Sequence, residues 1–239
     1  MAANQKRGTS PWVYIGCGCV VLLILAIGGC FAAGFFGVTQ FRGFVEEMED
    51  PVKREERVRE ILGARELPAG YHAQLFFRIP LLMEMVIISD GEALEFDAGG
   101  GREPTIDVEH LGEHVFMFFS MRDMGGNRRE MERWFEGESS TPGDVDFNVD
   151  FHSQEFLGRG EFEIGSQRLR YMAHRGEIDY EDAIYAVLWI ECPNADRVRI
   201  GFYWLRLDPA TVETPEFAGT PADEEVLRDF MGHFNLCAG

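Results

Sequence analysis

Apolar residues form one long segment near the start of the chain. Residues 12–38 are mostly apolar and none of them is charged. A helix of this length, rising about 1.5 Å per residue, is long enough to cross a hydrocarbon core of about 30 Å. Trp12 and Tyr14 lie in its first turn, where aromatic rings favour the membrane interface. The pattern therefore predicts a short tail at 1–10 and a transmembrane helix at 11–39, with the lipid bilayer as its partner.

Three processing outcomes stay open for this segment. The run from Val20 to Ile27 fits the apolar stretch of a cleaved signal peptide. Ile27-Gly28-Gly29-Cys30 loosely resembles a lipobox, with Cys30 as the lipidated residue of a bacterial lipoprotein. However, the apolar run continues as far as Val38, where a cleaved peptide would turn polar. This continuation favours an uncleaved, single-pass signal anchor.

Positive charges lie on both sides of the predicted helix, so they do not decide its orientation. Lys6 and Arg7 precede it, and several cations between Arg42 and Arg57 follow it. A first apolar segment usually acts as an export signal, and long domains are translocated largely regardless of charge. We therefore expect residues 43–239 on the extracytoplasmic (periplasmic) side of a cell membrane.

Small residues recur every four positions along the predicted transmembrane helix. Small side chains allow two helix backbones to approach closely in lipid, which favours a homo-oligomer formed through the anchor. The alternative is that glycine and alanine are simply common in membrane helices. The two adjacent rows are Ala26, Cys30 and Gly34, and Gly29, Ala33 and Gly37.

A charged helix is predicted directly after the membrane segment. Asp50 is a favourable N-cap, and Pro51 suits the first helical position. Gly63 is typical of the residue that ends a helix, so the helix should end at about Leu62. We interpret residues 40–66 as a juxtamembrane stalk, which docks on the following domain or lies near the membrane surface.

From residue 67 onward the pattern changes to strands. Short apolar, aromatic or alternating runs are separated by turn residues, and one run with helical spacing is expected at 127–136. Two long runs around the Cys192–Asp196 turn read as a hairpin. The strands expected are 71–79, 83–89, 114–121, 144–151, 160–164, 167–174, 183–191 and 197–207.

A last amphipathic helix is predicted near the C-terminus. Thr220 would be its N-cap, Pro221 its first residue and Asp223 its third. Its apolar face would consist of Val226, Leu227, Phe230, Met231 and Phe234.

Strands outnumber helices and hairpin links predominate, which predicts an α+β domain with a mainly antiparallel sheet at 67–239. The element order is an early aromatic strand, several strands, a helix before a middle strand, long hairpins and a terminal helix. That order resembles the Mog1/PsbP-like α/β sandwich domains. The resemblance implies a sheet covered by helices, and it implies no functional residue.

The charge of the chain excludes one class of partner. Asp and Glu total 41 against 22 Lys and Arg, which gives a formal net charge of -19. Neutralising phosphates requires a basic surface, so no nucleic-acid partner is expected. Lys6 and Lys53 are the two lysines of the chain, so Schiff-base chemistry beyond the tail would have to use Lys53.

The cysteines divide between the two parts of the chain. Cys17, Cys19 and Cys30 lie in the apolar segment, where we interpret them as small apolar residues. Cys192 and Cys237 belong to the predicted soluble domain. In an oxidising compartment this pair is a disulfide candidate that would close a long loop.

Residue spacing suggests two candidate metal sites. His110 and His114 would share one face of a helix, but they lie about 13 Å apart in a strand, and the flanking pattern is that of strands. A second pattern places oxygen ligands at positions 1, 3, 5, 7 and 12 of a loop that resembles the calcium-binding EF-hand. Its residues are Asp144, Asp146, Asn148, Asp150 and Glu155.

The second pattern has a simpler interpretation. Val149 lies where the calcium loop needs a glycine, and alternating apolar residues over the same range are typical of a half-buried strand. No hydrolase, phosphate-loop or zinc-protease motif occurs, so the sequence offers no catalytic residue and implies no cofactor. The sequence therefore favours a non-catalytic, membrane-anchored domain that binds a protein or small ligand. The alternatives are an enzyme with scattered site residues and an assembly protein that oligomerises through its anchor.

Overall fold

The chain divides into two units, residues 1–46 and 47–239, and the second is described here. The computed structural model describes residues 47–94, 111–123, 126–136, 151–178, 181–193, 196–207 and 217–238. The predicted transmembrane helix at 11–39 lies outside these residues. None of the helices in the described ranges is long and apolar enough to cross a membrane.

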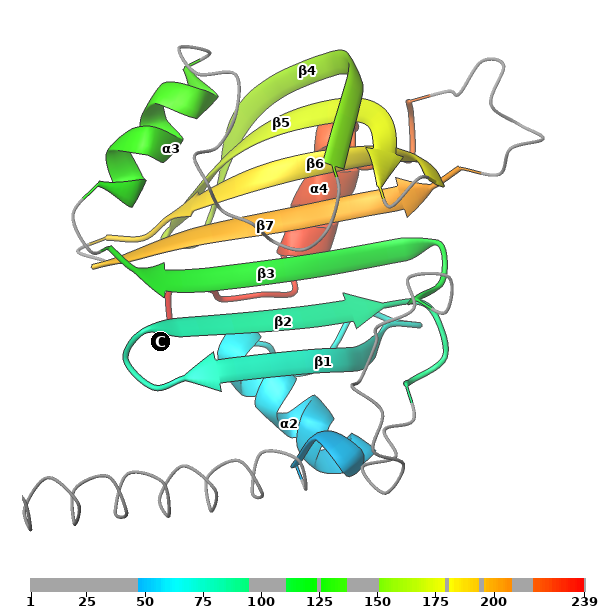
Figure 1. Cartoon of the computed structure of the whole chain (residues 1–239), viewed down its shortest axis with the longest axis vertical. Helices are drawn as coiled ribbons and strands as arrows, with labels where there is room; N and C mark the ends of the chain where they lie inside the picture. The colour runs from blue at the N-terminus through cyan, green and yellow to red at the C-terminus, as the bar shows by residue number, and fades with distance from the viewer. Residues whose placement is uncertain are drawn as a thin grey trace, which may run out of the picture. The chain divides into compact units, whose positions relative to one another are not determined.

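Seven strands form one antiparallel sheet in the order β1-β2-β3-β7-β6-β5-β4 (Figure 1). Every neighbouring pair is antiparallel, which confirms the predicted α+β class and sheet type. The strands are β1 (His72–Ile79), β2 (Met83–Ser89), β3 (His114–Arg122), β4 (Phe151–Ile164), β5 (Gln167–Ile178), β6 (Glu181–Glu191) and β7 (Arg197–Arg206). The described helices are α2 (Pro51–Leu62), α3 (Asn127–Phe135) and α4 (Glu224–Met231).

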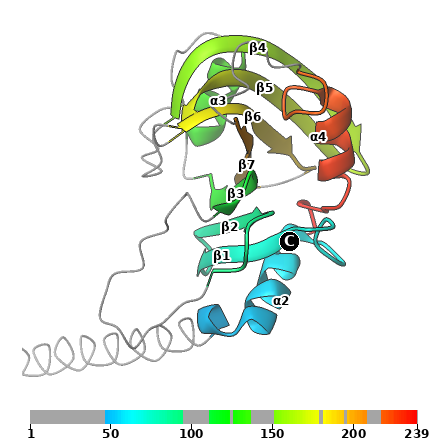
Figure 2. The same ribbon diagram turned by 90° about the vertical axis from the view of Figure 1, so that its right-hand side faces the viewer.

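The helix of the predicted stalk belongs to this unit. Asp50 caps α2 by accepting hydrogen bonds from the backbone of Val52 and Lys53, and Gly63 ends it in a left-handed conformation. Val58 and Leu62 are fully buried, and α2 packs against β1 and β2 (Figure 2). Of the two placements expected for this helix, the structure therefore shows docking on the domain.

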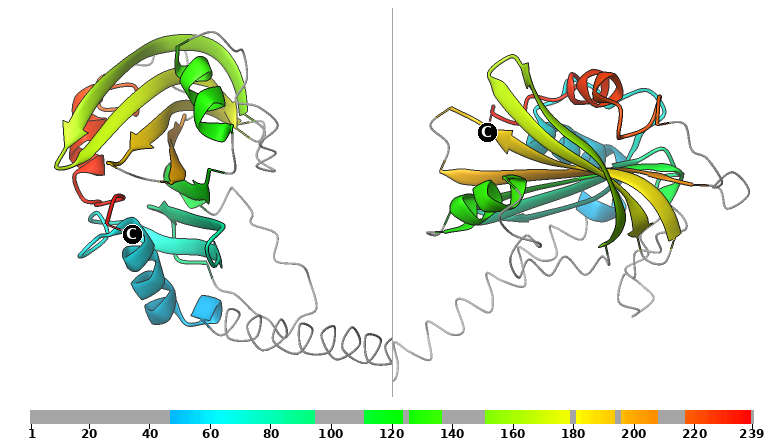
Figure 3. Two further views of the ribbon diagram at one scale, coloured as in Figure 1. Left: turned by 90° about the vertical axis from the view of Figure 1, so that its left-hand side faces the viewer. Right: turned by 90° about the horizontal axis from the view of Figure 1, so that it is seen from above.

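The two helices α3 and α4 lie on opposite sides of the sheet (Figure 3). On the first face, Val115, Met117 and Phe119 of β3 belong to the core that also contains Met131 and Phe135 of α3. On the second face, Phe116 of β3 contacts Phe230 of α4 and stacks on Phe234. The central strands β3, β6 and β7 are therefore apolar on both faces, which explains their continuous rather than alternating apolar pattern.

β4 differs from the prediction because it is one long strand. The sequence suggested a strand at 144–151 and another at 160–164, whereas a single strand runs from Phe151 to Ile164. Two register shifts, between Ser153 and Glu155 and between Phe156 and Gly158, interrupt its pairing with β5. Such bulges break the period of two on which strand prediction depends. Residues 144–150 lie outside the described part of the chain.

The predicted start of the last helix is wrong. α4 begins at Glu224, and its N-cap is Asp223, whose side chain accepts a hydrogen bond of 2.9 Å from the backbone of Glu225. Thr220 instead closes the preceding turn, because its hydroxyl donates to the carbonyl of Phe217 and accepts from the backbone of Ala222. Two good cap residues compete within four positions, and the turn uses the first of them.

Candidate functional site

The histidine and calcium-like patterns do not form a metal site in the described residues. Within those residues, no group of three or more His, Cys, Asp or Glu side chains is placed to hold a metal ion. His110 lies outside the described part, and His114 begins β3 with its Nδ1 2.8 Å from the carboxylate of Asp90. Glu155 is exposed on β4. The remaining calcium candidates, Asp144, Asp146, Asn148 and Asp150, lie outside the described part.

Asp90, directly after β2, contacts His114, the first residue of β3. The second carboxylate oxygen of Asp90 accepts a hydrogen bond of 2.9 Å from the backbone of His114. The imidazole ring lies 6.4 Å from the ring of Tyr203, whose hydroxyl is 3.0 Å from that of Tyr71. Burial raises the pKa of both tyrosines, so both hydroxyls stay neutral at physiological pH. We interpret this cluster as a structural hydrogen-bond network that closes one end of the sheet.

The structure joins Cys192 and Cys237 in a disulfide, with their Cα atoms 5.5 Å apart. Cys192 directly follows β6, and Cys237 is close to the C-terminus. The bond therefore ties the C-terminal segment to the end of the β6–β7 hairpin. The helix-packing candidates in the apolar segment, Ala26, Gly29, Cys30, Ala33, Gly34 and Gly37, lie outside the described residues, so self-association through them stays a prediction.

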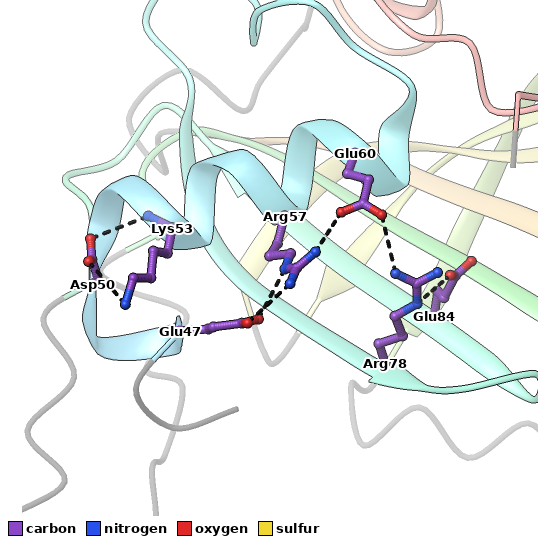
Figure 4. Close-up of polar contacts among 7 residues, drawn as sticks. All are labelled: Glu47, Asp50, Lys53, Arg57, Glu60, Arg78 and Glu84. Carbon is purple, nitrogen blue, oxygen red and sulfur yellow. Dashed lines mark hydrogen bonds and ion pairs between the residues drawn. The ribbon is translucent and has the colours of Figure 1, made fainter. Parts of the chain in front are cut away.

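A chain of ion pairs joins α2 to the edge of the sheet (Figure 4). Arg57 lies 3.1 Å from Glu47 and 2.8 Å from Glu60, and Glu60 is 3.5 Å from Arg78, which lies 3.0 Å from Glu84. Hydrogen bonding to Arg57 lowers the pKa of the Glu60 carboxyl. Most of these side chains are substantially exposed, so each pair contributes little stability. We interpret this series of ion pairs as a structural link between α2 and the sheet rather than as a functional site.

A pocket of about 370 Å³ lies between the end of α3, β4 and β5. Arg170 of β5 projects into it, because its guanidinium carbon lies 5.1 Å from the centre of the Trp189 ring and 5.8 Å from that of Phe135. Cation–π attraction of this kind holds a guanidinium group beside aromatic rings. Arg170 is therefore fixed in place without using its N–H groups.

A second arginine and two acidic residues line the same pocket. Arg159 of β4 pairs with Met172, and Glu161 pairs with Arg170, so the side chains of all four share one face of the sheet. Glu136 follows the last residue of α3. The pocket thus gathers charges of both signs from three elements.

The charges in the pocket differ in whether the protein neutralises them. Glu161 lies 2.7 Å from Arg168. Among the residues that the structure describes, the side chains of Arg159, Arg170 and Glu136 form no ion pair or hydrogen bond. Two cations and one anion therefore face the pocket without a protein counterion in the described part.

A serine and a histidine meet further along the same face of the sheet. The hydroxyl of Ser153 on β4 lies 2.8 Å from Nδ1 of His174 on β5. The imidazole ring stacks on Tyr185, with ring centres 5.4 Å apart, and contacts the edge of Phe156. Burial lowers the pKa of His174, so its ring is neutral at physiological pH and able to accept a proton. A base beside a hydroxyl is the arrangement that activates a serine nucleophile.

None of these residues was selected from the sequence, because strand pairing brings them together. Arg159 and Arg170 are eleven positions apart, and Ser153 and His174 are separated by a whole hairpin. The available signal was the alternation of Arg168 and Arg170 with Leu169 along one strand, which places both arginines on one face. It does not show which of them lacks a partner.

Comparisons with known proteins identify no relative of the chain. No protein-family model, curated protein or solved structure matches the chain. The inference of function therefore depends on the geometry described above.

Proposed function

We propose that the chain is a single-pass membrane protein whose extracytoplasmic domain binds a ligand without transforming it. The observation that carries this proposal is the pocket beside α3, in which Arg159, Arg170 and Glu136 have no counterion among the described residues. Pockets for small molecules combine aromatic lining residues with a few placed polar groups, and Phe135 and Tyr171 line this pocket beside its charged residues. The sequence also left open a second type of ligand, which is a protein partner.

Two further observations support the cellular location. Residues 12–38 have the length and polarity of a membrane anchor. The disulfide between Cys192 and Cys237 is typical of an oxidising compartment such as the periplasm. Both agree with a domain held outside the cytoplasm next to the bilayer.

Membrane fractionation tests this location directly. The full-length chain should stay in the membrane pellet after a carbonate wash, and protease added to intact bacterial spheroplasts should digest residues 47–239. Release by carbonate would contradict the anchor, and protection in intact spheroplasts would contradict the orientation. Intact-mass measurement of the mature protein separates an uncleaved anchor from a cleaved signal peptide or a lipid on Cys30.

A membrane-tethered hydrolase is the second candidate function, because of the contact between Ser153 and His174. In that reaction the Ser153 oxygen would bond to an acyl carbon while its proton passes to His174, and the bond to the leaving group would break as His174 gives that proton to it. Water would then release the acyl group from Ser153 by the same proton transfers through His174. A fluorophosphonate probe should then label Ser153 in the wild-type chain, and His174→Gln should lower the labelling rate by about a hundredfold. Ser166→Ala, at an exposed turn serine, is the control and should label normally. Absence of labelling at Ser153 would leave the binding function as the single proposal.

A further inference from the structure

The unpaired charges beside α3 indicate which class of small molecule the pocket accepts. The guanidinium carbon of Arg170 lies 5.1 Å from the ring centre of Trp189 and 5.8 Å from that of Phe135, so cation–π attraction restrains the group before any ligand arrives. A guanidinium in a fixed plane offers two parallel N–H groups, which match the two oxygens of a carboxylate. A pre-oriented group loses little side-chain entropy on binding, and this increases affinity.

Arg159 is placed to reach the same ligand group. Its Cα partner is Met172, while that of Arg170 is Glu161, so the two arginines are diagonal neighbours on adjacent strands. Diagonal neighbours lie about 7–8 Å apart, within reach of two long side chains that converge on one anion. The carboxylate of Glu161, which lies across the strand pair from Arg170, is 2.7 Å from Arg168, so Arg159 and Arg170 stay without an ion pair among the described residues.

The other side of the pocket is negative. Glu136 has no ion-pair partner among the described residues and lies at the C-terminal end of α3. Unpaired carbonyl groups give that end of a helix a partial negative charge, which favours cations. A dianion such as phosphate would be repelled by Glu136, whereas an ammonium group would be attracted to it.

The size of the pocket limits the ligand to a small molecule. About 370 Å³ is near the lower end of the range of about 300–1,000 Å³ for ligand pockets. From these observations we infer that the pocket binds a small zwitterion, a free amino acid or a short peptide. The carboxylate of the ligand lies on Arg170 and Arg159, and its ammonium group lies at Glu136. This inference rests on the proposed binding function and names its ligand class.

Calorimetry with blocked peptides tests the two charged contacts separately. The full-length chain in lipid nanodiscs is titrated with L-alanine, trialanine, N-acetyl-trialanine, trialanine amide and inorganic phosphate. We expect L-alanine or trialanine to bind, and the corresponding blocked peptides to bind about tenfold more weakly, because each lacks one charge-assisted contact. Phosphate should bind more weakly than either zwitterion.

Substitutions assign the contacts to residues. Arg170→Ala should weaken zwitterion binding about tenfold, and Arg170→Lys, which keeps the charge over Trp189 but not the fork, should also weaken it. Glu136→Gln should weaken binding of trialanine but leave N-acetyl-trialanine unchanged, because the acetylated peptide has no ammonium group. Arg65→Ala, at an exposed arginine outside the pocket, is the matched control and should bind normally.

Three results would overturn the inference. These are wild-type affinity for zwitterions in both Arg170 variants, phosphate binding tighter than the zwitterions, and no binding of any zwitterion. If no zwitterion binds while the domain remains membrane-bound and accessible to protease, the ligand class is wrong and the proposed display function stands. If the chain is released by carbonate, the proposed function itself fails whatever the calorimetry shows.

Discussion

Arg54 is an arginine buried inside the domain, with 1% of its surface exposed. Its guanidinium group donates hydrogen bonds of 2.8–2.9 Å to the backbone carbonyls of Ala73, Met48 and Leu94. These three residues belong to β1, to the segment before α2 and to the segment after β2. Burial lowers the pKa of Arg54, but the pKa of an arginine is so high that the group stays charged. One side chain therefore ties three separate segments together.

Replacing Arg54 should cost much more stability than replacing its exposed neighbour. Arg54→Ala leaves three buried carbonyl groups without these donors, and we expect a loss of at least about 3 kcal/mol in the free energy of unfolding. Lys53→Ala is the matched control, because Lys53 is 56% exposed and its ion pair with Asp50 is long, at 3.8 Å. Urea denaturation of both variants measures the difference. Equal losses would show that the hydrogen bonds of Arg54 contribute little.

His174 should make the stability of the domain depend on pH. Burial lowers its folded pKa below the unfolded value of about 6.5, so the unfolded chain binds the proton first. The stability contributed by neutral His174 is therefore complete above about pH 6.5 and is lost as the pH falls below it. The melting temperature of His174→Gln should fall less between pH 7.5 and 5 than that of the wild type. A parallel fall in both chains would contradict this prediction.

For some helices and strands, the local sequence pattern is sufficient to predict the bounds. β2 was predicted with the bounds that the structure gives, Met83–Ser89, because an apolar run between turn residues leaves one interpretation. α2 was predicted equally well from Asp50, Pro51 and Gly63. β4 and the start of α4 were not, since bulges and competing caps depend on neighbouring strands and turns rather than on the local run.

Asp223 should stabilise α4 more than Thr220 does. Asp223→Ala removes the N-cap hydrogen bond to Glu225, and we expect a loss of about 1 kcal/mol. The interaction of its charge with the helix dipole adds to this effect, and Asp223→Asn removes that charge while keeping a side-chain oxygen as acceptor. Thermal denaturation of Asp223→Ala and Asp223→Asn separates the two contributions. No change in either variant would contradict the assignment of this cap.

At the scale of the whole molecule, the C-terminal segment links parts that are far apart in the sequence. Gln167 of β5 donates a hydrogen bond to the carbonyl of Phe234 and accepts one from the backbone of Leu236, each of 2.8 Å. The backbone of Asn235 donates to the carbonyl of Leu62, the last residue of α2. The disulfide of Cys237 therefore fastens a segment that contacts both α2 and the sheet.

Removing the disulfide should destabilise the domain substantially. The bond joins residues 45 positions apart, and a loop of that length corresponds to about 4 kcal/mol of chain entropy in the unfolded state. Cys192→Ser with Cys237→Ser should therefore lower the melting temperature, and a reducing agent should lower that of the wild type alone. A thiol assay of the denatured chain should find two more thiols after reduction than before, which are those of Cys192 and Cys237. Equal numbers of thiols before and after reduction would contradict the bond.

The candidate site could not be predicted from local sequence patterns, and Arg159 and Arg168 show why. Both are arginines on neighbouring strands, yet Arg168 lies 2.7 Å from Glu161, while Arg159 has no such partner in the described part. A sequence shows which side chains are charged. Whether a charge is neutralised depends on which side chains the strand register brings together. The same is true of His174. Its position in the sequence does not indicate a partner, and the pairing of β4 with β5 brings the Ser153 hydroxyl to within 2.8 Å of its ring.

The sequence by itself determined the features that depend on neighbouring positions. These are the apolar stretch at 12–38, the bounds of α2 and β2 and the antiparallel α+β class, because periodicity and caps are local properties. Only the tertiary structure decided the strand order, the bulges of β4 and the pocket of Arg159 and Arg170. Those depend on contacts between distant residues, and a contact exists only once the register of the strands is set.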